Sequence, residues 1–192
     1  LSPPAAATVC LMTRGDLVTW EGTSPAVERI RDALIPHASA GALRVVLQQL
    51  ALHEEGRAVG THEVIDTIVD VGGNLVVVPI ADTVRADPGS CAALDRALAH
   101  LRTDLEAGPG TAVDSLEVII DADSTRRVRF TLSVEVSPEE VAGRPPHPAL
   151  HDGRHHIVHH APSLEDLRDR LAAPPPGMLQ RLRGMVGGRR AA

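Results

Sequence analysis

The alternation of apolar and polar residues predicts the most regular part of the fold. In "RRVRFTLSVEV", every second residue from Val128 to Val136 is apolar, whereas the residues between them are polar or charged. Strict alternation is typical of a strand with one packed face and one face that meets water or a partner. The preceding apolar run "SLEVIID" is predicted to be a second strand, joined to the first through the acidic turn "ADST".

Three more strands are predicted before residue 80. The run "ALRVVLQQLALHEEG" fits a helix or a strand by periodicity alone, but its bounding glycines, Gly41 and Gly56, and its β-branched residues favour a strand. The next runs, "RAVGTHEVIDTIVD" and "NLVVVPI", flank Gly72-Gly73, a pair suited to a tight hairpin turn. Three consecutive antiparallel strands are the simplest arrangement of this part of the chain.

Helical spacing predicts three helices around the sheet. The first follows Ser24, a suitable cap, with Pro25 in its first turn, and the second follows Ser90 and ends at the "AGPG" run. The third begins at Ser163, with Asp166 three residues later in the spacing of a capping box. Each helix has an apolar stripe, which consists of Val27, Ile30 and Leu34 in the first, Leu94, Ala97, Leu98, Leu101 and Leu105 in the second, and Leu164, Leu167 and Leu171 in the third.

These elements predict an α+β fold: an antiparallel sheet of about five strands with two helices packed on one face, plus a C-terminal helix. A single domain is expected over residues 23–173. Residues 1–22 are interpreted as a disordered or artefactual extension, because Met12 can serve as the initiator. Residues 138–162, rich in proline, glycine and histidine, are expected to form a long loop, and residues 174–192 a basic, flexible tail.

Charge is distributed unevenly along the chain. All 25 acidic residues precede Pro174, whereas four of the 19 basic residues follow it, so the part before Pro174 carries a net charge of −10. A body this acidic disfavours nucleic acid as a partner, because phosphates require a positive field, and it favours a basic protein partner. Solubility alone is the other explanation of this charge.

The composition excludes several classes of protein. Two cysteines, Cys10 and Cys91, make neither a disulfide framework nor a metal-binding motif. No apolar run reaches the roughly 18 residues that span a bilayer, and "LSPPAAATVCLM" lacks the basic start and the sustained apolar core of a signal peptide. We therefore expect a cytoplasmic protein with no membrane segment. The absence of lysine and the scarcity of aromatic residues indicate a GC-rich genome.

The segment "HPALHDGRHHIVHH", residues 147–160, holds six of the ten histidines. His155 and His159 are four residues apart, as are His156 and His160, so a helix would place two pairs on adjacent faces and a strand would place them on opposite faces. Zinc requires three or four ligands about 2 Å from the metal, so either pair needs a further ligand from elsewhere. Metal binding at these four residues is therefore weighed against a solvated histidine-rich loop. A pH response is a third interpretation, because several imidazoles titrate near pH 6.5.

No catalytic motif is found elsewhere in the sequence. Asp121 and Asp123 are predicted in one turn, and Glu54 and Glu55 in another, where acids are common for their turn geometry. The sequence contains no Gly-x-Ser-x-Gly elbow and no phosphate-binding loop, and Cys91 lies on a predicted helix without a basic residue next to it. Because no nucleophile–base pair can be named, we expect neither an enzyme nor a cofactor.

The run "LDRALAHLRTDLEAGPGTAVDSLEVIIDADSTRRVRFTLSVE" combines a leucine-rich helix, a glycine-bearing loop, a strand, an acidic turn and a second strand. With the preceding helix and meander, from Ser24 to Glu135, this order resembles the YezG-like family of small acidic bacterial immunity proteins. Members usually have a tryptophan where this chain has Ala112-Val113-Asp114. They also tend to end the last strand in an aromatic-Asp-aromatic-Asp run, where this chain has Thr131-Leu132-Ser133-Val134. No binding residues are carried over from the family.

The resemblance implies a non-catalytic protein-binding module, specifically an immunity protein that neutralises a cognate basic toxin by occlusion. An acidic, half-exposed sheet face would cover the toxin's active site. Two alternatives come from the residues themselves. The first is a metal- or pH-responsive module that uses the segment His147–His160. The second is a scaffold or dimerisation domain that uses exposed strand edges.

Overall fold

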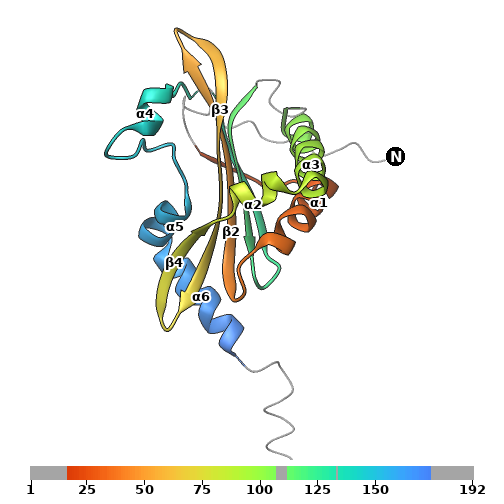
Figure 1. The fold of residues 1–192 in the computed structure, drawn as a ribbon, viewed down its shortest axis with the longest axis vertical. Coiled ribbons are helices and arrows are strands. Elements are labelled where there is room, and N and C mark those ends of the chain that lie inside the picture. The colour runs from red at the N-terminus through yellow and green to blue at the C-terminus, as the bar shows by residue number, and fades with distance from the viewer. Residues whose placement is uncertain (1–16, 107–111, 133, 174–192) are drawn as a thin grey trace, which may run out of the picture.

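The chain folds into one six-stranded antiparallel sheet with helices on both faces (Figure 1). The computed structural model describes residues 17–106, 112–132 and 134–173. The sheet has the order β1-β6-β5-β2-β3-β4. Its strands are β1 (Val18–Trp20), β2 (Ala42–Glu54), β3 (Arg57–Val71), β4 (Asn74–Pro79), β5 (Val113–Asp121) and β6 (Arg126–Leu132). The predicted α+β class is confirmed, with six strands rather than about five.

Two groups of helices lie on opposite sides of this sheet. In Figure 1, α1 and α3 lie on one side, and α5 and α6 lie on the other. The helices are α1 (Pro25–Leu34), the 3-10 helix η1 (Ile35–His37), α2 (Ala81–Ala86), α3 (Pro88–Glu106), α4 (Pro138–Ala142), α5 (Gly153–His159) and α6 (Ala161–Ala172). The three helices predicted from periodicity correspond to α1, α3 and α6. The other four are too short to give a periodic signal.

The sheet begins earlier than the expected domain boundary at residue 23. Strand β1 pairs antiparallel with β6, with Val18 opposite Phe130 and Trp20 opposite Val128. Val18 and Trp20 also pack against the main core. The expected extension over residues 1–22 is therefore wrong for its last residues, because a three-residue strand shows no alternation in the sequence. Residues 1–16 and the expected basic tail, residues 174–192, lie outside the described residues.

The β3–β4 hairpin confirms the predicted turn. Gly72 and Gly73 both have positive φ angles, 61° and 90°, a conformation that a two-residue hairpin turn requires and that side chains disfavour. The Asp70 carboxylate accepts a hydrogen bond from the Gly73 N–H at 2.7 Å. This turn places β4 at the edge of the sheet opposite to β1.

Helix α1 begins as predicted, whereas α3 has a different cap. The Ser24 hydroxyl accepts a hydrogen bond from the Ala26 N–H at 3.0 Å. Ser90, the predicted cap of α3, lies inside that helix, and the Asp87 carboxylate accepts from the N–H groups of Gly89 and Ser90 instead. A carboxylate caps a helix as well as a hydroxyl does, and Asp87 lies directly before the first helical residue. The predicted end of α3 at "AGPG" lies outside the described residues.

Helix α6 begins at Ala161, two residues before the predicted start at Ser163. Pro162 fits the first turn because its missing N–H would have no partner there. The Ser163 hydroxyl is occupied elsewhere, since it accepts a hydrogen bond from Arg44 at 3.1 Å. The capping-box spacing in the sequence is therefore not used as a cap, and Ser163 joins α6 to the sheet.

The main core lies between the sheet and the helices α1 and α3. Alternate residues of the strands supply one side of this core, and the predicted stripes of α1 and α3 supply the other. Its buried strand residues include Val45, Leu47, Ile65, Leu116, Val118, Ile120, Val128 and Phe130. A smaller apolar cluster of Val46, Ile68 and Leu164 lies on the other face of the sheet. Among the described residues, no helix is both long enough and apolar enough to cross a membrane.

Candidate functional site

The histidine-rich segment forms helix α5, so the loop expected over residues 138–162 is wrong at two places, α4 and α5. The Asp152 carboxylate caps α5 by accepting a hydrogen bond from the His155 N–H at 2.8 Å. A helix of seven residues is marginal on its own in water. We therefore attribute the order of α5 to its packing against the sheet.

Helix α5 approaches the sheet most closely at Gly153. The Gly153 N–H donates a hydrogen bond to the Asp66 carboxylate of β3 at 2.8 Å. A Cβ atom on this residue would lie only 2.7 Å from the Cγ1 of Val77 in β4. Glycine is therefore the residue that allows this contact, and it fixes the start of α5 against β3 and β4.

The sheet surface beneath α5 and α6 is polar, and we call it the polar face. Its residues occupy the strand positions that alternate with those of the main core, and most of them are buried. They are Arg44, Gln48, Asp66, Ser115, Glu117, Asp121, Arg127, Arg129 and Thr131. Alternation in β6 predicted a face that meets water or a partner. The neighbour of this face is the C-terminal part of the same chain, so its acids are not available as a half-exposed acidic surface.

Asp121 neutralises two arginines on this face. It accepts hydrogen bonds from the Nε of Arg44 at 2.6 Å and from a terminal nitrogen of Arg127 at 2.7 Å. Arg44 is among the largest fully buried side chains of the protein, and it also donates to Ser163 of α6. Asp121 was interpreted as a turn residue, but it is the last residue of β5 and pairs with charges that would be costly to bury alone.

Glu117 of β5 is the centre of a second cluster. It accepts two hydrogen bonds from Arg129 of β6, both at 2.6 Å, and one from the Nε2 of His156 at 2.7 Å. The Nδ1 of His151 lies 3.5 Å from the same carboxylate. Burial alone would raise the pKa of Glu117, but the hydrogen bonds from His151, His156 and Arg129 outweigh it and hold the pKa well below its usual range.

His156 is fully buried between Glu117 and Arg44. Its Nδ1 lies 3.4 Å from a terminal nitrogen of Arg44, and a guanidinium can only donate. The Nδ1 therefore accepts, and the ring proton lies on Nε2, which donates to Glu117. Burial lowers the pKa of His156 more than the neighbouring carboxylate raises it, which agrees with a neutral ring.

The other histidines of α5 lie in contact around His155. Its ring stacks on His151 at a centroid distance of 4.3 Å and lies 4.5 Å from His159. His160 lies 4.9 Å from His156. Burial, together with these neighbouring histidines, lowers the pKa of His155 to about 4, and burial, with His156 and Arg129, lowers that of His160 to about 4.

The structure places the four candidate metal ligands in the two pairs expected for a helix, His155 with His159 and His156 with His160. Both ring nitrogens of His156 have protein partners, so this residue has no lone pair for a metal without losing Arg44. Within the described ranges, no group of three or more His, Cys, Asp or Glu side chains is placed to hold a metal ion.

Gln48 of β2 is a site residue that the sequence reasoning missed. Its side-chain amide donates to the Ala149 carbonyl at 2.6 Å and accepts from the His151 N–H at 2.8 Å. The amide thus holds the segment before α5 as a neighbouring strand would. A signal was present, because Arg44 and Gln48 are polar residues spaced four apart in an otherwise apolar strand, which places them on one face.

The remaining candidates from the sequence do not form a catalytic arrangement. Asp123 accepts hydrogen bonds from Arg170 of α6, and the thiol of Cys91 accepts one from Arg85 at 3.4 Å. The hydroxyl of Ser90 lies 2.9 Å from the Nε2 of His37 but donates its proton to Asp87 at 2.7 Å. With its proton on Asp87, the hydroxyl of Ser90 accepts from His37, the reverse of what a general base would require.

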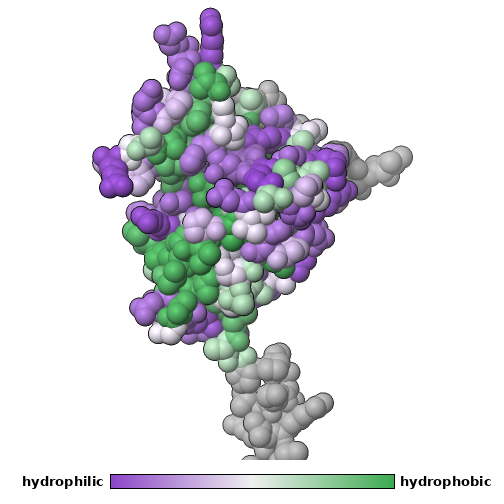
Figure 2. Space-filling view, viewed as in Figure 1, coloured by the Kyte–Doolittle hydropathy of each residue, from purple (hydrophilic) through white to green (hydrophobic). Residues whose placement is uncertain are grey.

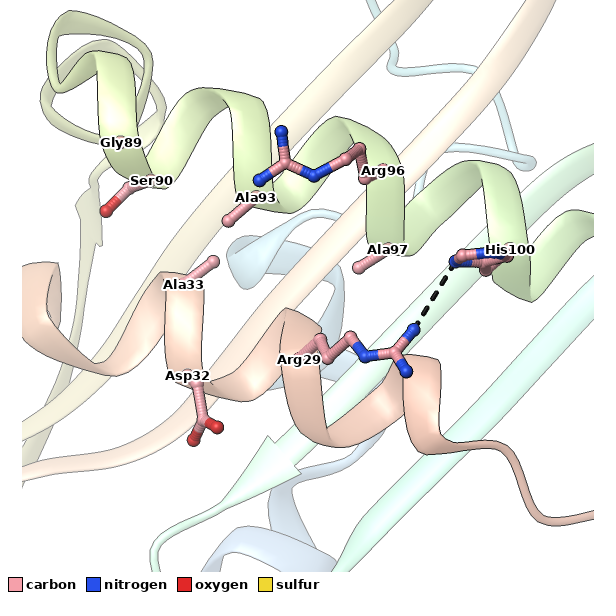
Figure 3. A pocket seen from close by; sticks show the side chains of 9 residues that line it. All are labelled: Arg29, Asp32, Ala33, Gly89, Ser90, Ala93, Arg96, Ala97 and His100. Carbon is pink, nitrogen blue, oxygen red and sulfur yellow. Dashed lines mark hydrogen bonds between the residues drawn. The ribbon is translucent and has the colours of Figure 1, made fainter.

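A groove of about 480 Å³ runs between α1 and α3 (Figure 3). The alanines Ala33, Ala93 and Ala97 lie between the two helices, and their small side chains leave the space open. At the rim, a terminal nitrogen of Arg29 lies 3.4 Å from the Nδ1 of His100. Small side chains account for the shape of this groove, and its charged rim is exposed to solvent.

The outer edge of β4 is the main apolar surface of the protein. The strand reads "NLVVVP" and contains no charged residue, and its inner edge pairs with β3. Val76 is 41% exposed, and Val71, just before the turn, is 58% exposed. On the other side of the strand, Val158 of α5 is 70% exposed. Figure 2 shows hydrophobic side chains gathered over β4 and the neighbouring helix.

Comparison with known proteins adds no further assignment. No model of a protein family matches the chain, and no curated protein is similar to it.

Proposed function

We propose that the protein is a non-catalytic protein-binding module that pairs an extended segment of a partner protein with the free edge of β4. The observation that carries the proposal is an uncharged edge strand between exposed valines, Val71 and Val76 on one side and Val158 on the other. Addition of a strand to such an edge provides main-chain hydrogen bonds for affinity, and the apolar side chains provide specificity.

The other broad surfaces of the sheet favour this choice of interface. The face beneath α1 and α3 forms the main core, and the polar face is covered by α5 and α6. The opposite edge strand, β1, has only three residues, and a short edge gives few hydrogen bonds to a partner. The edge of β4 is the longer one, and within the part of the chain that the structure describes no strand pairs with its outer side.

The test compares two lysine substitutions. Val76→Lys places a charge in the middle of the edge, whereas Val59→Lys makes the same change at a residue of β3 that is 50% exposed and lies beyond the part of β3 that pairs with β4. Tagged wild-type, V76K and V59K chains are isolated from cells, and retained proteins are quantified by mass spectrometry. We expect proteins that bind wild type and V59K but not V76K, and that slow hydrogen exchange in β4. Equal retention by V76K would refute the proposal.

A second candidate function, a pH response of the histidine segment, is favoured by the five imidazoles packed around α5. Protonation of His155 or His160 would place a positive charge next to His151, His156 and His159 in the same segment. The charged groups that face them from the sheet are Arg44 of β2, Glu117 of β5 and Arg129 of β6. Two arginines oppose further positive charge and one carboxylate favours it, so we expect acid to weaken the contact of α5 with the polar face.

Hydrogen exchange of peptides covering residues 151–160 tests this second function. Exchange should speed up between about pH 7.5 and pH 5, after correction for the intrinsic pH dependence of exchange, while peptides of α3 remain protected. The double variant His155→Gln/His160→Gln should lose this difference between the two regions. A wild-type segment that stays as protected as α3 at the lower pH would contradict the response.

A further inference from the structure

The two edges of the sheet differ in how they are protected from pairing with another chain. Natural edge strands are usually short, charged or bent, which prevents association through their free N–H and C=O groups. Strand β1 is protected by its length of three residues. Strand β4 has six residues, no charge, and its single proline at the last position. The edge of β4 therefore lacks the usual features that keep a strand unpaired.

The side chains beside the β4 edge would be covered by a neighbour of the same kind. Val76 lies on the sheet face that carries α1, and Leu75 and Val77 lie on the face that carries α5. Leu75 packs with the cluster beneath α6, and the side chain of Val77 is the neighbour of Gly153. Helix α5 packs against β3 and β4, so the exposed Val158 belongs to the same apolar area (Figure 2).

We infer that the strand that occupies this edge is β4 of a second copy of the chain, antiparallel to the first, so that two six-stranded sheets become one. This inference rests on the proposed function and names its partner. The chain has a formal net charge of −6, so two copies repel each other over most surfaces. A stretch without charge is where such copies can meet at the least electrostatic cost. An edge strand is also self-complementary, because an antiparallel pair of identical strands has a two-fold axis.

The alternation of side chains restricts the register of the pair. Residues directly opposite each other must point to the same face, so the two-fold axis passes through a residue and not between two. With Val76 on the axis, Val76 faces its own copy, Leu75 faces Val77 of the second copy, and Asn74 faces Val78. These pairs are apolar or uncharged, and such pairs stabilise a sheet. An axis through Val77 would bring Pro79 into the ladder, where it cannot donate a hydrogen bond.

Sedimentation equilibrium of the full chain tests the second copy directly. We expect wild type to reach twice the chain mass of 20.3 kDa as its concentration rises from about 1 to 200 μM, because a five-residue ladder with flanking valines gives a small interface. V76K places two like charges opposite each other on the axis and should raise the dimer dissociation constant at least about tenfold. V59K should leave it unchanged. A wild-type chain that stays monomeric over this range, or a V76K chain that dimerises equally, would overturn the inference.

Cysteine crosslinking tests the register, in chains whose Cys10 and Cys91 are replaced by serine. Val76→Cys should form a covalent dimer with a short thiol-reactive crosslinker, whereas Val59→Cys should not. A mixture of Asn74→Cys and Val78→Cys chains should crosslink more than either chain alone, because these residues face each other only between copies. Equal yields from Val59→Cys, or no gain on mixing, would overturn the assigned pairing.

The failure of this inference can be told from the failure of the proposed function. A monomeric wild-type chain that still retains other proteins through Val76, with slower exchange in β4, overturns only the second copy. A monomeric chain whose retained proteins ignore V76K overturns both. Dimerisation that V76K abolishes supports both.

Discussion

The two faces of the sheet are both covered by helices, but they are held by different chemistry. On the face beneath α1 and α3, strand β5 places Leu116 and Val118 in an apolar core. On the polar face, the residue between them, Glu117, is just as buried and has three partners. Apolar packing tolerates small changes in shape, whereas a buried carboxylate requires all its partners. The same strand therefore has one face with graded tolerance and one whose members depend on each other.

The largest expected effect comes from removing the charge at the centre of the polar face. Glu117→Gln keeps the shape of the side chain but leaves Arg129 and His156 without their acceptor. We expect the free energy of unfolding to fall by about 3–5 kcal/mol, the cost of breaking a buried ion pair on one side. Urea denaturation followed by circular dichroism measures it. Glu139→Gln, at an exposed acid of α4, is the control, and a loss as small as in this control would contradict the role of Glu117.

The next effect tests the apolar face by the same measurement. Leu101 of α3 is fully buried in the main core, and Leu101→Ala should lower the free energy of unfolding by about 3 kcal/mol. The two faces should differ in where hydrogen exchange speeds up. Leu101→Ala should affect both groups of helices, whereas Glu117→Gln should affect residues 151–172 first. Equal patterns for the two variants would remove the distinction between the faces. Leu171→Ala, at an exposed residue of α6, is the control.

A smaller effect tests the close contact between α5 and the sheet. Gly153→Ala adds a Cβ within 2.7 Å of Val77 and 3.1 Å of the Asp66 carboxylate. Val77 must shift, and we expect a loss of about 1–2 kcal/mol in the free energy of unfolding. Gly60→Ala is the matched control, because nothing lies within 4 Å of the added atom. If the two alanine variants are equally stable, α5 does not pack as closely as described.

The smallest effect is the dependence of stability on pH. The pKa values of His155 and His160 are lowered to about 4 in the fold, compared with about 6.5 in an unfolded chain. The unfolded state therefore binds more protons between these values, and the stabilisation present above pH 6.5 is lost as the pH falls towards 4. Glu117, whose pKa is also lowered, adds a further loss only below about pH 4.5.

Denaturation midpoints measured between about pH 7.5 and 4.5 follow this loss. His155→Gln/His160→Gln should reduce the slope, while His100→Gln, at an exposed residue of α3, should keep it. A wild-type midpoint that does not change between pH 7 and about 5 would contradict the burial of these rings.

Much of the fold could be predicted because its longest elements have strong periodic patterns. Alternation from Val128 to Leu132 and helical spacing from Leu94 to Leu105 each follow from burial on one face. The turn at Gly72-Gly73 follows from backbone geometry alone. Strand β1 and the short helices were missed, because three to seven residues give no period and are ordered by contacts that are distant in sequence.

The site could be predicted only in part, because its chemistry depends on pairing between distant segments. The four-residue spacing of His155 and His159 predicted the pairs that the structure contains. Nothing local shows that Glu117 meets His156, 39 residues later, or that Gln48 holds Ala149. Alternation identified the polar residues of β6, but it is the same for a face that meets water and for one that meets another part of the chain.

Hydrogen exchange of the wild-type chain at low and high protein concentration compares the polar face and the β4 edge in a single measurement. Residues 151–160 should be protected equally at both concentrations, because α5 is held within one chain. Residues 74–79 should gain protection only at the higher concentration, as their outer amides pair with a second copy. Rapid exchange of 151–160 at both concentrations, or protection of 74–79 that does not depend on concentration, would contradict a closed polar face and an open binding edge.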